Sequence, residues 1–159
     1  MDKLDIVTDE SGNEVVLLPE IIFSNKQNIN WNDVEDYLGK YVGELIEIAE
    51  TRDIIYIGNK FPDEYGGSSY TRKTKGARAK AKANAAQGIR EMVEIATDKV
   101  YRENHKEKHS EDAHNGWFYY VTRFAIPLYN NEKKTGEYNV YSACLVVNHA
   151  ANGKMYLYD

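Results

Sequence analysis

Residues able to catalyse RNA cleavage without a metal ion occur in the last third of this chain. His109 precedes an aromatic segment, residues 117–124, that contains Arg123, and His149 and Lys154 follow farther along. Such cleavage requires a general base, a general acid and a cation that stabilises the charge on phosphorus. The two histidines are candidates for base and acid in either order. Arg123 and Lys154 are candidates for contact with the phosphate.

Each candidate also has an ordinary structural explanation, and the sequence leaves both open. His109 lies in a run of charged residues that is typical of a solvated loop, and His149 lies in a segment that resembles a turn. Arg123 stands in the middle of an aromatic strand pattern, where a cation requires a ligand or an ion-pair partner.

A metal site is a weaker alternative. His105 and His109 are spaced to share a helix face, and His114 or Asp112 would complete the ligand set. The spacing lacks the His-Glu-x-x-His arrangement, and no cysteine accompanies it. Residues 66–69 (Gly-Gly-Ser-Ser) are not followed by the Gly-Lys-Ser/Thr of a phosphate-binding loop. We therefore expect no metal ion and no cofactor.

A basic segment without acidic residues extends from residue 65 to residue 90, within a chain of net charge −5. On a helix, positions 75, 78 and 82 would share one face and could follow a phosphate backbone. The alternative is a solvated face of an alanine-rich helix. The cations predicted to bind substrate are Arg72, Lys73, Lys75, Arg78 and Lys82.

The elements that must position these residues include a β-rich C-terminal part. Apolar residues alternate along 117–128, and β-rich runs follow at 138–147 and 154–158, after a predicted loop at 130–137. The Asn-Gly pair at 152–153 is a strong hairpin signal between the last two runs. This pattern predicts an antiparallel meander.

Helices are predicted before the meander. Asn32 resembles a helix N-cap, and apolar residues recur at helical spacing over 34–49. A short β-rich run at 53–58 precedes an alanine-rich basic helix over 74–87, and Gly88 would separate that helix from its apolar continuation.

The predicted class is therefore α+β, with N-terminal helices packed on an antiparallel β-meander of about four strands. Residues 1–30 would form a peripheral N-terminal hairpin or extension, and residues 31–159 a single domain. The single cysteine, Cys144, excludes a disulfide framework. No apolar run approaches the length of a membrane helix, so we expect a soluble, intracellular protein that does not contact membranes.

Several segments resemble a domain of phage and mobile-element proteins, the phage branch of the barnase/EndoU/colicin/RelE-like nuclease superfamily. The resemblance covers roughly residues 53–159. It rests on Tyr-Thr-Arg-Lys at 70–73, Ala-Lys-Ala-Lys-Ala-Asn-Ala-Ala-Gln-Gly-Ile at 79–89, Glu-Met-Val-Glu-Ile-Ala at 91–96, Lys-His at 108–109, Gly-Trp at 116–117, Thr-Arg-Phe-Ala at 122–125 and Asn-Gly-Lys-Met-Tyr-Leu-Tyr-Asp at 152–159.

The resemblance implies N-terminal helices on a four-stranded antiparallel sheet, with metal-independent RNA cleavage on one sheet face. The positions that match its polar residues are His109, Arg123, His149 and Lys154, with Tyr156 as an auxiliary. Members of the superfamily differ in their catalytic residues, and several have none. The resemblance therefore implies a phage or mobile-element encoded, metal-independent ribonuclease-like domain that acts in the bacterial host cytoplasm. The alternative is a noncatalytic phage-encoded module that binds nucleic acid, a nucleotide or a host defence protein and inhibits host defence.

Overall fold

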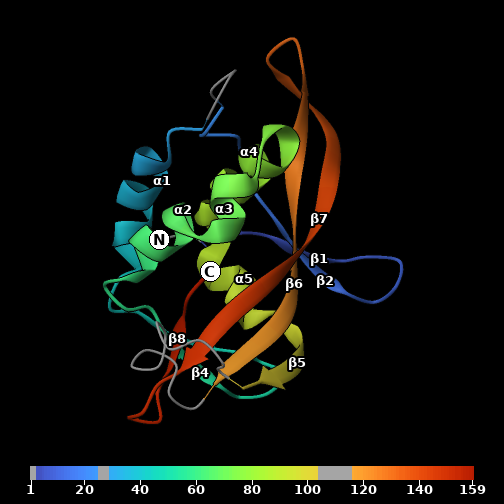
Figure 1. Cartoon of the computed structure of the whole chain (residues 1–159). Coiled ribbons are helices and arrows are strands. Elements are labelled where there is room, and N and C mark those ends of the chain that lie inside the picture. Colours follow the sequence, from blue (N-terminus) through green and yellow to red (C-terminus); the bar gives the residue numbers. More distant parts are fainter. Residues whose placement is uncertain (1–2, 25–28, 104–115) are drawn as a thin grey trace.

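The helices of this chain gather on one side of a long two-stranded ribbon, β6–β7, that belongs to a single mixed sheet (Figure 1). The computed structural model describes residues 3–24, 29–103 and 116–159. The helices are α1 (Trp31–Leu38), α2 (Phe61–Gly67), α3 (Ser69–Lys73), α4 (Gly76–Ala85) and α5 (Ile89–Glu94), with 3₁₀ turns η1 (Gly39–Tyr41) and η2 (Ala86–Gly88). None of the helices in these ranges is long and apolar enough to cross a membrane.

The sheet has eight strands in the described part of the chain, in the order β1-β2-β6-β7-β8-β4-β3, with β5 paired to β6. The strands are β1 (Ile6–Thr8), β2 (Glu14–Leu17), β3 (Leu45–Glu47), β4 (Ile54–Tyr56), β5 (Thr97–Arg102), β6 (Trp117–Asn130), β7 (Lys133–His149) and β8 (Met155–Leu157). The class is α+β, as predicted. The prediction of about four antiparallel strands after the helices is wrong, because β2–β6 and β4–β8 are parallel and four strands precede α2. Strands of three or four residues are too short for their alternation to stand out in a sequence.

Alternation along β6 and β7 gives the sheet two faces. Tyr120, Leu145 and Val147 belong to the main core cluster, which also contains α4, η2 and α5 residues. We call the face that carries these three residues the inner face and the opposite face the outer face. Since successive strand residues point to opposite faces, Tyr119 and Asn148 belong to the outer face.

The β6–β7 ladder is longer than the sequence predicted. Residues 130–137 were expected to form a loop, but pairing continues to Asn130 and Lys133. The two residues between them, Asn131 and Glu132, have φ angles of 50° and 68°. Two left-handed residues give the tight turn that suits the twist of a hairpin, so the strands extend to the turn itself. The predicted Asn-Gly hairpin is confirmed, since β7 and β8 are antiparallel and Gly153 has φ 85°.

The first predicted helix is much shorter than its apolar pattern suggested. Asn30, rather than Asn32, is the N-cap, and its side chain accepts a hydrogen bond from the Asn32 backbone N–H. The helix ends at Leu38, and Gly43 has φ 92°, which a continuing helix does not permit. The remaining apolar residues form β3, where Ile46 is buried.

The basic helix is interrupted at the predicted position. α4 ends at Ala85, and η2 leads through Gly88 into α5. A Cβ at Gly88 would lie 3.1 Å from Leu18 and 3.3 Å from Val16, so the glycine permits close packing of the helix on the N-terminal segment. The predicted N-terminal hairpin is present as β1–β2, and β2 joins the main sheet beside β6.

Candidate functional site

The predicted catalytic residues in the described part of the chain do not share one face of the sheet. Arg123 and Tyr156 occupy outer-face positions, because Arg123 alternates with buried Thr122 and Tyr156 pairs with Asn148. His149 follows Asn148 and points to the opposite face. Its ring lies 5.5 Å from the ring of Phe118, which packs against the main core cluster. His149 therefore lies on the opposite face of the sheet from Arg123 and Tyr156.

Arg123 is also remote from the end of the sheet where Tyr156 lies. Arg123 pairs with Ser142, whereas Tyr156 pairs with Asn148. Six residues along a strand span about 20 Å. His109, together with His105 and His114 of the alternative metal site, lies outside the described residues. Within the described ranges, no three His, Cys, Asp or Glu residues are grouped so that they could hold a metal ion.

Aromatic rings from β4, β8 and β6 line the outer face, and β7 lies between the last two strands. Tyr56 of β4 lies 5.7 Å from Tyr156 of β8, measured between ring centroids. Trp117 of β6 meets Tyr158 edge to face at 5.2 Å. Tyr119 follows along β6 and is half-buried. Rings on a sheet face form a platform on which planar ligands such as nucleic-acid bases stack.

Cations stand among these rings. Lys154 Nζ lies 5.1 Å from the centroid of the Tyr56 ring, and Arg102 lies 5.5 Å from the centroid of Tyr119. Arg123 is half-buried and occupies the same face farther along β6. These positive charges distinguish the outer face from the overall acidic chain, and they are placed to contact an anionic ligand that lies on the rings.

A cavity of about 280 Å³ opens where β7 and β8 meet the loop after β4. We call it the Asn148 pocket. Its polar lining includes Asn148, Tyr156, Lys60 and Glu64. Lys60 is the N-cap of α2, and Glu64 lies one turn into that helix. A carboxylate, an ammonium group, a phenol and an amide therefore line one cavity, together with the core residues Phe61 and Leu157.

Asn148 is unusual among the polar residues of this pocket. Its side chain is 5 % exposed, and its Oδ1 has no hydrogen-bond partner among the described residues. Buried polar side-chain atoms nearly always have a partner, because leaving one unpaired costs about 1–3 kcal/mol. Its strand neighbours are Trp117 and Tyr156, and neither donates a hydrogen bond to that atom.

The backbone after β4 gives the pocket its depth. A Cβ at Gly58 would lie 3.4 Å from the Tyr156 ring, so the ring lies directly over the glycine backbone. Asn152 of the β7–β8 turn reaches the Tyr156 hydroxyl at 3.5 Å, a long contact. These contacts hold the Tyr156 ring at the pocket wall.

The predicted substrate-binding cations separate into two groups. Arg72, Lys73, Lys75 and Arg78 are exposed on α3, α4 and the turn between them, whereas the side chain of Lys82 is only 12 % exposed. None of these cations lines the Asn148 pocket. Their role in binding stays a prediction.

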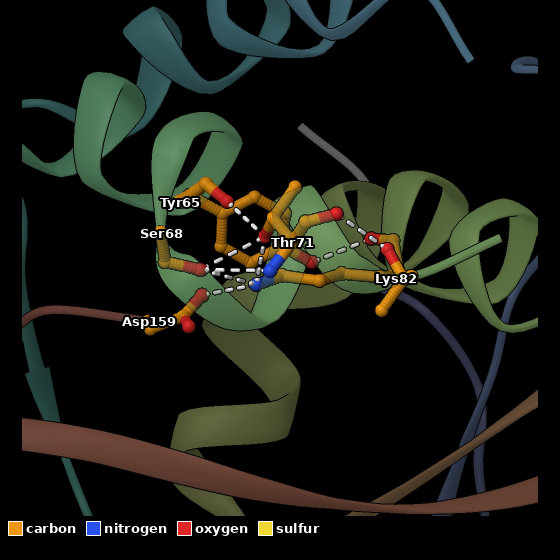
Figure 2. Close-up of polar contacts among 6 residues, drawn as sticks. Tyr65, Ser68, Thr71, Lys82 and Asp159 are labelled. Atoms are coloured by element: carbon orange, nitrogen blue, oxygen red, sulfur yellow. Dashed lines mark hydrogen bonds and ion pairs between the residues drawn. The ribbon is translucent and has the colours of Figure 1, made fainter. Parts of the chain in front are cut away.

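Lys82 is the centre of a buried polar cluster (Figure 2). Its ammonium group forms an ion pair with Asp159 and donates hydrogen bonds to Thr71 Oγ1 at 2.5 Å and Ser68 Oγ at 3.5 Å. It also lies 4.6 Å from the centroid of the Tyr65 ring. We call these five residues the Lys82 cluster. It links three helices to the segment that follows β8.

Burial dominates the electrostatics of this cluster. It lowers the pKa of Lys82 and raises the pKa of Asp159, in both cases against the opposing effect of their mutual attraction. Both directions mean that removal from water costs more than the pairing returns, as is common for buried ion pairs.

A larger cavity of about 580 Å³ adjoins the Lys82 cluster, between α4, α5 and β7. Its walls are mainly apolar, and Lys82 and Asp159 line one end while Arg78 lies at its rim. The ammonium and carboxylate at that end already satisfy each other. We therefore place the candidate site at the smaller Asn148 pocket, where a buried polar group has no partner.

A third polar cluster surrounds Asp53 next to the main core. Asp53 accepts hydrogen bonds from Tyr120 at 2.8 Å and Thr51 at 2.7 Å, and it pairs with Lys99 at 2.8 Å. Burial alone would raise the pKa of Asp53. The bonds from Lys99, Thr51 and Tyr120 outweigh that effect and hold the pKa below its ordinary value.

Sequence reasoning identified Tyr156 and Lys154 but missed Asn148, Lys60 and Glu64. The signal for Asn148 was a polar residue directly after the buried run that ends at Val147, but strand ends often carry polar residues. Lys60 and Glu64 are about ninety residues from Tyr156 in sequence, and only the parallel pairing of β4 and β8 brings them together.

Comparison of the chain with protein-family models, with curated proteins and with solved structures found no match. The function must therefore be argued from the chemistry of the residues on the outer face.

Proposed function

We propose that this protein binds single-stranded RNA across the outer face of its sheet and cleaves it at the Asn148 pocket without a metal ion. The observation that carries the proposal is the mixture of aromatic rings and cations on one sheet face, next to a cavity lined by acid–base groups. Single-stranded RNA has unstacked bases and a regular negative charge, and it requires both kinds of contact.

RNA bases would stack on the tyrosine rings of the outer face. Tyr56, Tyr119 and Tyr156 present half-buried rings on the outer face. Stacking of one base on one ring contributes about 1–3 kcal/mol. Lys154 and Arg102 lie beside these rings and would contact the phosphates between successive bases. The net charge of −5 makes binding depend on this local arrangement rather than on general attraction.

Cleavage would use the groups that line the pocket. Glu64 is a candidate general base for the ribose 2′-hydroxyl, and Tyr156 is a candidate general acid for the leaving 5′-oxygen. Lys60 and Lys154 would stabilise the negative charge that develops on phosphorus. His149 takes no part in this proposal, because it stands on the inner face against Phe118. His109 lies outside the described residues, and its role as a base or acid stays a separate prediction from the sequence.

The second candidate is a noncatalytic module that binds nucleic acid, a nucleotide or a host defence protein. The observation that favours it is the separation of His149 and Arg123 from Tyr156, because a metal-independent ribonuclease needs its acid, base and cation around one phosphate. The two candidates share the outer face and differ only in the chemistry at the pocket.

One experiment separates them. Purified protein is incubated with labelled single-stranded RNA in EDTA, and cleavage and binding are measured in parallel, binding by fluorescence anisotropy. We expect cleavage in EDTA that falls at least about 100-fold in Glu64→Gln and Tyr156→Phe, the scale of general acid–base catalysis. The matched control is His149→Ala, which should cleave as the wild type does.

The outcomes are distinct. Binding without cleavage across pH 5 to 9 would favour the noncatalytic module. Cleavage lost in His149→Ala but kept in Tyr156→Phe would refute the assignment of residues. Absence of RNA binding would refute both the site and the function.

A further inference from the structure

The unpaired amide of Asn148 suggests that the pocket has a more specific task than holding the backbone of RNA. We infer that the Asn148 pocket holds one adenine base, turned out of the strand and read by the Asn148 side chain. This inference rests on the proposed binding of RNA and names the base at the same site.

The Asn148 amide is buried and incompletely paired. Asn148 is 5 % exposed, and its Oδ1 lacks a hydrogen-bond partner among the residues that the structure covers. The only other such atom in those residues is Oε2 of Glu44, whose second oxygen pairs with Arg90. Asn148 alone of the two lines the Asn148 pocket. A donor that reached this oxygen from the pocket would satisfy it.

Adenine has a hydrogen-bonding edge that matches an asparagine amide. An asparagine amide offers one acceptor and two donors in a single plane. Adenine offers the complementary pair on one edge, since its 6-amino group donates and its N7 accepts, and this is the usual partner of asparagine in nucleic-acid recognition. Guanine presents two acceptors on the same edge and would leave Oδ1 of Asn148 facing an oxygen.

The pocket around that amide has the volume and the walls to hold a base. The pocket measures about 280 Å³, enough for a purine ring. Tyr156 forms one wall, and its ring is positioned over Gly58 for stacking with an inserted base. Lys154 lies beside Tyr56, the neighbour of Tyr156, and is placed for the phosphate of the turned-out nucleotide.

The test removes one chemical group at a time from the RNA base and from the protein. Binding is measured by anisotropy for nine-residue 2′-O-methyl oligouridines with adenosine, guanosine or nebularine at the centre. Nebularine is adenosine without its 6-amino group, and 2′-O-methylation removes the hydroxyl that cleavage requires. The proteins are the wild type, Asn148→Leu and the control Asn139→Leu, an exposed asparagine of the same strand.

We expect the wild type and Asn139→Leu to bind the adenosine oligomer at least roughly fivefold more tightly than the other two, the scale of one bidentate contact. Asn148→Leu should bind all three equally. In ¹⁵N-correlated NMR spectra, the side-chain amide signals that disappear in Asn148→Leu should shift when the adenosine oligomer is added, which shows that the effect is local.

Equal binding of the three oligomers by the wild type, or an adenosine preference that survives in Asn148→Leu, would overturn the inference and leave RNA binding intact. Failure of the wild type to bind any oligomer would overturn the proposed function, and the inference with it.

Discussion

The Asn148 pocket and the Lys82 cluster both bury polar side chains beside a cavity, but they differ in how those side chains are satisfied. In the Lys82 cluster the ammonium group has a carboxylate, two hydroxyl groups and a ring around it. In the Asn148 pocket a buried amide oxygen has no partner in the described structure. A saturated cluster fixes how its segments pack, whereas an unpaired polar atom still lacks a partner that a ligand can supply.

The comparison also corrects a sequence-based expectation about charge. Lys82 was grouped with the exposed cations of the basic segment, yet it is the cation that the fold uses internally. In the sequence, Asn148 is an isolated polar residue near a turn, and nothing around it indicates a site. Burial changes the role of both residues, because it makes the Lys82 charge a structural link and leaves the Asn148 amide oxygen without a partner among the described residues.

The largest expected change in the free energy of unfolding comes from the Lys82 cluster. Lys82→Met should lower the free energy of unfolding by about 3–5 kcal/mol, because it leaves the Asp159 carboxylate buried without its partner. Urea denaturation measures the change. The matched control is Lys80→Met on the same helix, which should change stability by less than about 0.5 kcal/mol.

A double variant sharpens this prediction. Lys82→Met with Asp159→Asn removes both charges and should recover most of the loss, because neither variant residue buries an unpaired charge. Equal stability of Lys82→Met and the wild type would show that the cluster is not a structural link, and the contrast with the Asn148 pocket would fail.

Removing the Asp53 carboxylate should have an intermediate effect on the free energy of unfolding, and this effect should depend on pH. The pKa of Asp53 is lower in the folded state than in the unfolded chain, so its contribution is present above the unfolded value of about 4 and is lost as pH falls through the lower folded value. Asp53→Asn should lower the free energy of unfolding by about 1.5–3 kcal/mol at pH 7.

Below pH 4 this difference should shrink, because the unfolded chain then takes up a proton at Asp53 while the folded protein keeps the carboxylate until a lower pH. Thermal unfolding of both proteins from pH 7 to pH 2.5 measures it. A difference that stays constant over this range would contradict the assigned hydrogen bonds from Tyr120, Thr51 and Lys99.

A smaller effect is expected at His149. His149→Ala removes the ring contact with Phe118 and should cost about 0.5–1.5 kcal/mol, while RNA binding and cleavage stay at wild-type levels. Unfolding and cleavage assays on the same preparation provide the two measurements. Loss of cleavage without loss of stability would place His149 in the chemistry and return it to the candidate site.

The smallest effect on stability is expected in the Asn148 pocket. Asn148→Leu should leave the free energy of unfolding unchanged or raise it by up to about 1 kcal/mol, because an apolar group of similar shape replaces an amide with an unpaired oxygen. Thermal unfolding measures it. Destabilisation by more than about 1 kcal/mol would show that the amide has a structural partner, and the two regions would then be alike.

The sequence by itself determined the α+β class, the ribbon of β6 and β7, the Asn-Gly hairpin before β8 and the break of the basic helix at Gly88. These features depend on neighbouring residues, through alternation, turn conformation and helical spacing, and such local patterns can be read directly. The outer-face positions of Arg123 and Tyr156 follow from the same alternation.

Only the tertiary structure decided which polar residues meet. The parallel pairing of β4 with β8 brings Lys60 and Glu64 to Tyr156, and three separate helices contribute to the environment of Lys82. A one-residue difference along β7 places Asn148 and His149 on opposite faces of the sheet. Contacts between distant segments depend on the packing of the whole chain, and the burial that makes one amide significant and one ammonium structural is a property of that packing alone.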